Sequence, residues 1–264
     1  MKKLLSLILA GSMLFSLAAC GGSSESKDDD SDKKNSSDIV ENNGGVGEEN
    51  DGFVADKGDS DADFSDTQVG DYITFGSYEQ DNDLSNGKEP VEWLVLDEQD
   101  GRILVISKYA LDAKPYNDEY VDVTWETCTL RSWLNDEFFS EAFTSSEKSQ
   151  IPTVTVTADS NPNYDTNPGN NTQDKVFLLS IEEANEYFDS DGERECHATE
   201  YAIAQGAFMS ESTGYEGNCY WWLRTPGRSS SYACSVYYNG YVYNNGSCVD
   251  NLIVAVRPAM WIEL

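Results

Sequence analysis

Few residues in this chain belong to the types that usually act as nucleophiles, catalytic bases or transition-metal ligands. The sequence contains one histidine, His197, which follows Cys196, and six cysteines in total. A Ser–His or Cys–His hydrolase needs a histidine base, so only His197 could serve in such a site. Zinc sites use Cys and His ligands at short spacings, and no such cluster occurs. We therefore predict no metal centre of this kind and an exposed, polar role for His197.

Carboxylates are abundant, because 48 Asp and Glu residues outnumber 17 Lys and Arg and give a formal net charge of −31. A carboxylate pair could act as acid and base in glycan hydrolysis, but no pair stands out by its spacing. Asp59, Asp61 and Asp63 resemble the start of a calcium loop, yet Phe64 and Gly70 replace its required glycine and glutamate. We predict no cofactor, although a structural calcium ion is compatible with the acidic surface. The same charge repels phosphate backbones and excludes nucleic acid as a partner.

The residues best suited to contact a ligand lie in the run YYNGYVYNNG at 237–246. Tyrosine and asparagine offer large rigid contact area together with hydrogen-bonding groups, as in adaptable binding surfaces. Burying so many hydroxyls and amides would leave donors without partners, so we expect much of this hairpin to be exposed. An ordinary exposed hairpin with cross-strand tyrosine pairs is the alternative. The predicted ligand-binding residues are Tyr237, Tyr238, Asn239, Tyr241, Tyr243 and Asn244.

A second aromatic stretch, NCYWWLRTPG at 218–227, is typical of the protein interior rather than of a binding surface. On a strand, alternate side chains face opposite ways, which puts Trp221 and Leu223 together on an apolar face. Arg224 on the other face could stack on Trp222 or pair with a carboxylate. The predicted structural core includes Trp93, Trp133, Trp221, Leu223 and Trp261.

Strands are expected at both ends of the domain that holds these residues. Segments 91–96 and 102–107 flank Asp100-Gly101, a strong hairpin signal, and a shorter strand is expected at 72–75. Asn239-Gly240 predicts a type I′ turn in the C-terminal hairpin. Strands at both chain ends indicate that these ends meet in one sheet.

The middle of the domain is expected to contain helices. Apolar residues recur at helical spacing between 130 and 138, with Thr129 as the expected N-cap. Thr144 with Glu147, and Ser180 with Glu183, match the capping-box pattern of a helix start. Together with the strands, these helices indicate the α+β class, with two main helices, mixed or antiparallel sheets and a loop-rich C-terminal half.

The N-terminus predicts export and lipid attachment. Lys2 and Lys3 precede an apolar run that is too short to span a membrane, and the run ends at a small-residue site before Cys20. This pattern resembles the bacterial lipobox, so residues 1–20 are predicted to be a lipoprotein signal peptide, with Cys20 as the lipidated residue.

The remaining chain divides into a linker and one domain. Residues 21–66 are rich in Gly, Ser and acids and are expected to form an extended spacer. Residues 67–264 are long enough for a single globular domain. Its odd number of cysteines leaves at least one thiol free, and the sequence does not determine any disulfide pairing among Cys128, Cys196, Cys219, Cys234 and Cys248.

Several motifs in order suggest a known family. The segments VGDYITFGSYEQ, EWLVLD, TLRSWLN, NPGNNTQDKVFLLS, WWLRTPG and AVRPAMWI resemble a family of secreted or lipid-anchored Gram-positive bacterial domains of unknown function. The resemblance implies a fold related to C-type-lectin-like and formylglycine-generating-type domains. It supplies no catalytic residues. The lectin calcium motif Glu-Pro-Asn is not met either, because Val91 follows Glu89-Pro90.

These patterns favour a lipoprotein on the outer face of the cytoplasmic membrane, with an extracellular recognition domain that performs no catalysis. We expect its partners to be a glycan or a protein at the cell surface, and the membrane itself through Cys20. Two alternatives are an extracellular hydrolase or modifying enzyme with unassigned carboxylates, and a structural module of a surface assembly.

Overall fold

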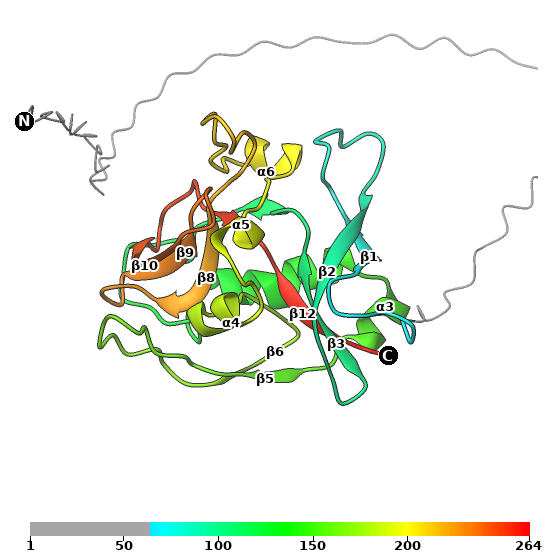
Figure 1. Cartoon of the computed structure of the whole chain (residues 1–264), viewed down its shortest axis with the longest axis horizontal. Helices are drawn as coiled ribbons and strands as arrows, with labels where there is room; N and C mark the ends of the chain where they lie inside the picture. The colour runs from blue at the N-terminus through cyan, green and yellow to red at the C-terminus, as the bar shows by residue number, and fades with distance from the viewer. Residues whose placement is uncertain (1–63) are drawn as a thin grey trace, which may run out of the picture. The chain divides into compact units, whose positions relative to one another are not determined.

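The computed structural model describes residues 64–264 (Figure 1). The predicted signal peptide, Cys20 and nearly all of the predicted linker lie outside these residues. Phe64 is buried, and its ring packs edge-on against Phe75 with 5.8 Å between ring centroids. The folded domain therefore already includes Phe64, so a boundary at residue 67 is too late.

The first sheet joins the two ends of the domain. Its strand order is β1-β2-β3-β12-β7, and all of its pairings are antiparallel (Figure 1). The C-terminal strand β12 lies between β3 and β7, which confirms that the first and last strands of the domain share one sheet. The strands are β1 (Tyr72–Tyr78), β2 (Glu89–Gln99), β3 (Arg102–Ser107), β7 (Val176–Phe177) and β12 (Ala259–Glu263).

The turn between β2 and β3 forms as its sequence predicts. Gln99 pairs with Arg102, so Asp100 and Gly101 are the two central residues of the hairpin. Their φ angles are +53° and +75°, and a type I′ turn needs positive φ at both positions.

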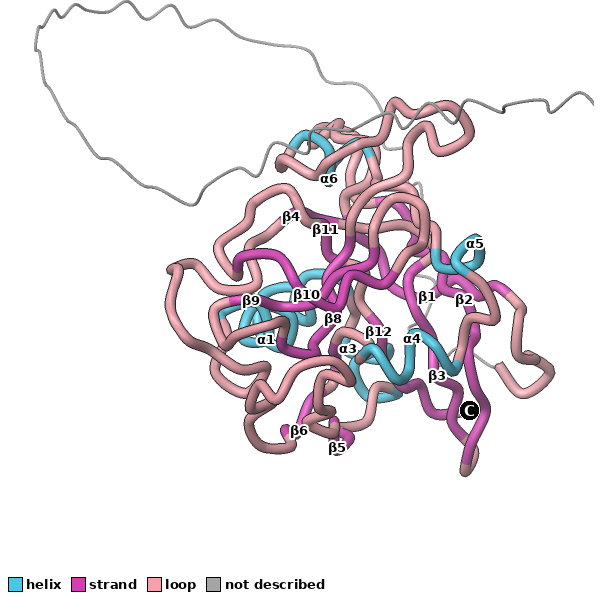
Figure 2. Tube along the Cα trace, turned by 60° about the vertical axis from the view of Figure 1, so that its left-hand side comes forward, coloured by secondary structure: helices cyan, strands magenta, loops and turns pink. Residues whose placement is uncertain are grey.

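The second sheet has the order β10-β9-β8-β11-β4, and Figure 2 shows β8, β9 and β10 side by side. The β8–β11 pairing is parallel and the others are antiparallel. A separate two-stranded sheet pairs β5 with β6. The strands are β4 (Asp112–Ala113), β5 (Val154–Val156), β6 (Thr172–Asp174), β8 (Trp221–Pro226), β9 (Tyr232–Val236), β10 (Val242–Cys248) and β11 (Ala255–Val256).

Helices are short, and the expectation of two main helices is wrong. Within 64–264, only the continuous helical segment of α1, η1 and α2 exceeds six residues. The described part of the chain contains no helix long and apolar enough to cross a membrane. The helices are α1 (Thr129–Trp133), the π-helical turn η1 (Leu134–Phe138), α2 (Phe139–Ala142), α3 (Ser145–Gln150), α4 (Ile181–Glu186), α5 (Asp191–Arg194) and α6 (Glu200–Ala204).

Helix starts follow the sequence in two of three cases. Thr144 and Ser180 both close the predicted capping boxes, at the starts of α3 and α4. Thr129 does not cap α1, whose N-cap is Cys128. The Thr129 hydroxyl instead accepts a hydrogen bond from the Asp118 backbone N–H at 3.0 Å, which explains the one-residue difference.

The core follows the tryptophan prediction only in part. Trp93, Trp221 and Leu223 are completely buried, and the Trp93 indole N–H donates to the Phe75 carbonyl at 2.7 Å. Trp133 and Trp261 are only half-buried, which corrects the prediction that they belong to the core. Each lies at the edge of the core, where a cation covers its ring. The Lys114 ammonium is 4.7 Å from the Trp133 centroid, and the Arg102 guanidinium is 5.3 Å from the Trp261 centroid.

Burial also determines how the thiols should react. Among residues 64–264 all five cysteines are free, and all except the half-buried Cys248 are buried. Burial raises the pKa of Cys128 and of Cys234 to about 12. The thiolate is the form of cysteine that reacts with electrophiles, and a raised pKa lowers its population. Burial also blocks access, so both effects slow alkylation of these thiols.

We expect Cys248 to react first with a maleimide under native conditions and all five thiols to react in denaturant. Peptide mapping by mass spectrometry at increasing reaction times would measure the order. A disulfide-linked peptide would contradict this prediction. Cys196 and Cys219 are the pair to inspect, because their backbones are joined by a 2.8 Å hydrogen bond.

Candidate functional site

A connected cluster of aromatic rings lies at the end of the second sheet where β9 turns into β10. The rings come from the loop after α6, from the residue before β8, and from the turn and first residues of β10. Each ring has its centroid within 6.3 Å of another. We call this cluster the aromatic surface, and it consists of Phe208, Tyr215, Tyr220, Tyr237, Tyr238, Tyr241 and Tyr243.

Tyr220 is the centre of the aromatic surface. Its ring stacks on Phe208, with 4.4 Å between centroids and 15° between planes. It also contacts Tyr237 at 4.9 Å and Tyr238 at 5.9 Å. Tyr220 immediately precedes β8, whose six residues are all buried. The aromatic surface is therefore attached directly to a fully buried strand of the sheet.

The outer rings leave polar groups accessible. Tyr215 packs edge-on against Tyr238 at 5.5 Å, and Tyr243 lies 4.7 Å from Tyr237. Tyr241 is the most exposed ring in the cluster, with 51% of its surface accessible. The other six residues are half-buried, so part of each side chain remains accessible to solvent.

Partial burial also sets the protonation of two hydroxyls. Desolvation raises the pKa of Tyr220 and of Tyr237 above the ordinary value, and Tyr243 raises that of Tyr237 further. Both phenols consequently remain protonated at neutral pH and can donate as well as accept hydrogen bonds.

The turn that carries the tyrosines differs from the prediction. Val236 pairs with Val242, so the connection has five residues, 237–241. Among non-glycine residues in 64–264, only Asn82 and Asp100 have positive φ, which excludes a type I′ turn at Asn239-Gly240. The turn closes instead through a 2.8 Å bond from the Gly240 N–H to the Tyr237 carbonyl.

Two buried side chains form hydrogen bonds to the backbone of this turn. The Arg194 Nε donates to the Gly240 carbonyl at 3.0 Å, and the Asn218 amide donates to the Tyr238 carbonyl at 2.8 Å. Asn218 also donates to a Glu195 carboxylate oxygen at 2.9 Å. These bonds fix the backbone of the turn that carries the tyrosines, and such preorganisation lowers the entropic cost of binding.

Two of the six predicted ligand residues have structural contacts instead. The Asn239 side chain accepts a bond from the Tyr241 N–H at 3.3 Å and so shapes the turn. The Asn244 amide donates to the side chain of Asn163 at 3.1 Å. Asn244 thus packs against the 157–171 loop and is not part of the aromatic surface. The four predicted tyrosines do belong to it.

Three members of the aromatic surface were missed by the sequence prediction. Phe208 and Tyr215 lie in a Gly- and Ser-rich loop, and an aromatic side chain in such a loop is the only local signal they give. Tyr220 belongs to the tryptophan-rich stretch that was assigned to the interior. Its position just before β8 lets its ring point out of the core while Trp221 remains fully buried.

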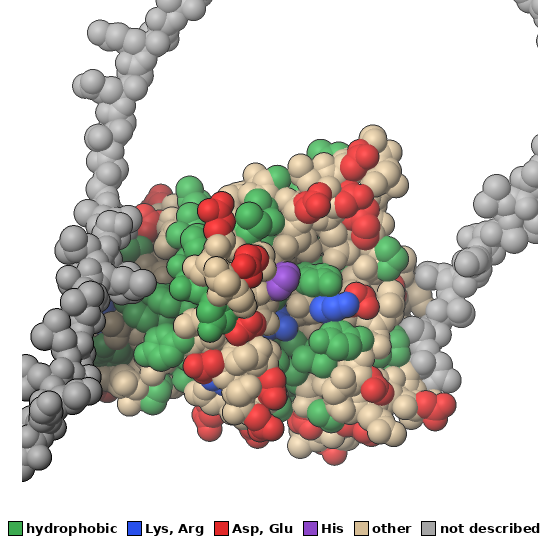
Figure 3. Space-filling view, turned by 45° about the horizontal axis from the view of Figure 1, so that its top comes forward, with side chains coloured by type: hydrophobic (Ala, Val, Ile, Leu, Met, Phe, Trp, Pro, Cys, Tyr) green, Lys and Arg blue, Asp and Glu red, His purple; other side chains and the backbone are tan. Residues whose placement is uncertain are grey.

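A second feature is an open pocket of about 300 Å³ beside His197. Figure 3 shows the histidine side chain among hydrophobic and acidic side chains. His197 is exposed, whereas the Cys196 thiol is buried and lies 3.7 Å from the Lys108 carbonyl. The two neighbours therefore face different sides of the backbone and do not form a thiol–imidazole pair. The pocket is also lined by Gln80, Asp81, Tyr109, Ala198, Thr199 and Glu200.

The architecture is that of a mixed α+β domain with mainly antiparallel sheets and few helices. The chain belongs to the family described as Domain of unknown function (DUF6273), whose model matches residues 100–264. No curated protein and no solved structure matches the chain. The matched region contains the whole aromatic surface and begins after β2.

Proposed function

We propose that this protein is a surface-anchored lipoprotein whose domain recognises a ligand without catalysis. The observation that carries the proposal is the aromatic surface, in which seven rings pack against one another and two buried polar side chains bond the backbone of the turn at 237–241. Clusters of partly exposed aromatic rings on a protein surface often mark an interaction site. The ligand is a glycan or a protein at the cell surface.

The chemistry of the aromatic surface suits both kinds of ligand. Tyrosine rings present flat apolar faces on which a sugar ring or an apolar side chain can stack, and their hydroxyls add hydrogen bonds. No Lys or Arg belongs to the cluster, so it offers nothing to a phosphate backbone. Nucleic acid is therefore not among the proposed partners.

The anchoring part of the proposal rests on the N-terminal sequence. Residues 1–20 would be removed up to Cys20, which would carry the lipid, and the acidic segment that follows would hold the domain away from the membrane. The protein would then lie on the outer face of the cytoplasmic membrane.

A C-type-lectin-like fold is the finer architectural proposal. It is supported by the meeting of the first and last strands in one sheet, and by the loops of the second sheet, which carry the aromatic surface. The calcium-dependent sugar motif of that lectin class is not met in this chain, so a glycan would be bound by the aromatic surface instead.

Replacing Tyr238 or Tyr241 by alanine should weaken ligand binding at least about tenfold, because buried aromatic anchors contribute about 2 kcal/mol to an interface. Binding of the full chain in detergent to a glycan array and to isolated cell-wall polysaccharide, with calcium and again with EDTA, would measure it. Tyr72→Ala provides the control, since Tyr72 is an exposed tyrosine on β1 outside the aromatic surface. Equal binding by all three variants would refute the site.

One observation favours the enzyme alternative. Asp81 lines the pocket beside His197, and the carboxylates of Glu79 and Glu89 lie close to it. An acid–base pair in a hydrolase needs such neighbouring carboxylates. Release of soluble sugars from cell-wall polysaccharide, lost in Glu79→Gln, would support this alternative. A protein that binds no small ligand and releases no product would instead be a structural module.

A further inference from the structure

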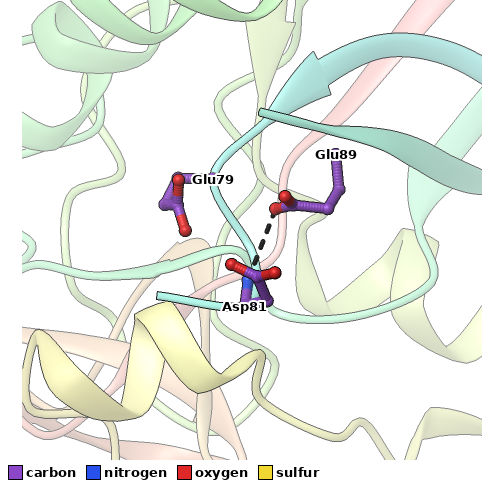
Figure 4. Close-up of side chains that lie close together, drawn as sticks. All are labelled: Glu79, Asp81 and Glu89. Atoms are coloured by element: carbon purple, nitrogen blue, oxygen red, sulfur yellow. Dashed lines mark hydrogen bonds between the residues drawn. The ribbon is translucent and has the colours of Figure 1, made fainter. Parts of the chain in front are cut away.

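The connection between β1 and β2 brings three carboxylates together. Glu79 directly follows β1, Glu89 is the first residue of β2, and Tyr78 pairs with Glu89 in the sheet. Asp81 lies two residues beyond Glu79. One carboxylate oxygen of each residue can be chosen so that all three lie within 4.8 Å of one another (Figure 4). The pairing of β1 with β2 therefore brings the acids at the two ends of the 79–89 connection close together.

Glu79 is the most buried member of the cluster, and the protein satisfies its carboxylate only in part, through the Asn82 backbone N–H. Only 7% of its surface is exposed, and its buried Oε1 atom has no hydrogen-bond partner. Buried polar atoms are almost always paired, because an unpaired one loses its hydration without compensation. Carboxylate oxygens of three acids within 4.8 Å of one another repel when ionised, so the cluster is unfavourable without a positive partner.

The other two carboxylates are held in position by the loop. A Glu89 oxygen accepts the Gln80 N–H at 2.7 Å. Asp81 accepts the Asp83 N–H at 2.8 Å and the Asn86 amide at 2.7 Å. A carboxylate has about four lone-pair directions, so these bonds orient both groups and leave acceptor sites for a ligand.

Neutralising side chains are missing from this cluster. Among the ion pairs formed within residues 64–264, none involves Glu79, Asp81 or Glu89. Lys88, next to Glu89 in the chain, reaches instead to Glu141, whose backbone carbonyl accepts its ammonium at 2.9 Å. The positive charge that the cluster requires is therefore not supplied by the neighbouring protein.

We propose that Glu79, Asp81 and Glu89 bind a calcium ion. All three ligands are hard carboxylate oxygens, which suit calcium and magnesium and not zinc or copper. Magnesium usually keeps most of its water and takes one or two carboxylates, whereas calcium accepts several carboxylates in flexible geometry. The three acids on a loop thus favour calcium, and water molecules would complete its six to eight ligands.

The site also has an access route. Asp81 lines the 300 Å³ pocket beside His197, so an ion can reach the cluster from solvent on that face. This inference is independent of the aromatic surface, because the three acids come from β1, β2 and their connection, which precede the family match. Bound calcium would tie the two ends of the 79–89 connection together.

Calorimetric titration of the full chain with calcium chloride tests the proposal. We expect a dissociation constant of about 10⁻⁴ to 10⁻³ M, the range of extracellular calcium modules, and weaker binding of magnesium. Glu79→Gln should raise the calcium dissociation constant at least tenfold. Asp81→Asn should raise it equally, and because Asp81 is exposed, this second substitution should leave the fold intact. Glu98→Gln is the matched control, because Glu98 is an exposed acid at the far end of β2.

Thermal unfolding supplies the second measurement. Calcium at tenfold excess over its dissociation constant should raise the melting temperature of the wild type and of Glu98→Gln, but not of Glu79→Gln or Asp81→Asn. In EDTA, Glu79→Gln should melt no lower than the wild type, because the amide removes like-charge repulsion. An equal calcium response in all four proteins, equal affinity for magnesium, or no response to calcium would overturn the proposal.

Discussion

Gly240→Ala is expected to lower the free energy of unfolding by about 3 kcal/mol and to abolish ligand binding. A β-carbon at this position would lie 1.6 Å from the backbone carbonyl oxygen of Asp191, the first residue of α5. Backbone atoms cannot turn aside as a flexible side chain can, so the turn at 237–241 would have to move. The φ angle of +76° adds a conformational penalty for any residue with a β-carbon.

Gly101→Ala is the control for this prediction. Gly101 has nearly the same φ angle, +75°, but its added β-carbon would meet nothing within 4 Å. It should therefore show only the penalty for left-handed backbone, about 1–2 kcal/mol, and should retain binding. Urea denaturation of both variants separates the two effects. Equal losses of stability would show that the approach of Gly240 to α5 is not required.

The two Xxx-Gly hairpin signals show what the sequence can predict locally. Asp100-Gly101 connects two strands of a regular hairpin and forms the expected two-residue turn. Asn239-Gly240 has an equally strong signal, but Gly240 lies against α5 and is bonded by Arg194. These contacts span more than forty residues of sequence. They impose a five-residue connection that local turn preferences could not predict.

Short-range sequence patterns predict the structure correctly where no long-range contact overrides them. Both capping boxes form because Thr144 and Ser180 need only the residue three positions ahead. Trp133 shows the limit of such patterns. Helical spacing correctly turns it toward the core, but it cannot show that the core ends there and that Lys114 covers the ring.

The candidate sites depend on long-range pairing and were predictable only in part. Tyrosines at 237–243 could be recognised because they form one run in the sequence. Phe208 and Tyr220 join them only when β8 and β9 pair. Glu79 lies near Glu89 because the pairing of β1 with β2 places Tyr78 opposite Glu89. The ten-residue connection between these strands contains no sequence signal that predicts this register.

Arg224→Met is the other substitution with a large expected effect, a loss of about 3–5 kcal/mol in the free energy of unfolding. Arg224 is 2% exposed. Its guanidinium donates to an Asp159 oxygen at 2.7 Å and to a Glu183 oxygen at 2.8 Å. It also donates to the backbone carbonyls of Leu178 at 2.9 Å and Thr157 at 3.1 Å. Methionine would fill the space but leave both carboxylates without their cation.

Glu183 makes this arginine important for the helix as well as for the core. The Glu183 carboxylate accepts the Ser180 N–H at 2.9 Å, which closes the capping box of α4, while it pairs with Arg224. Loss of the arginine should therefore also weaken the start of α4. Arg224→Lys should recover only part of the stability, because one ammonium cannot reproduce the planar fork that reaches four partners.

A double-mutant cycle with Glu183→Gln measures how the two residues depend on each other. If the unpaired carboxylate causes most of the loss, Arg224→Met combined with Glu183→Gln should be more stable than Arg224→Met alone, as judged by urea denaturation. Strictly additive losses would show that Arg224 acts mainly through Asp159 and the carbonyls of Leu178 and Thr157. Since β8 leads directly from Tyr220 to Arg224, ligand binding in the same variants would show whether this buried ion pair also supports the aromatic surface.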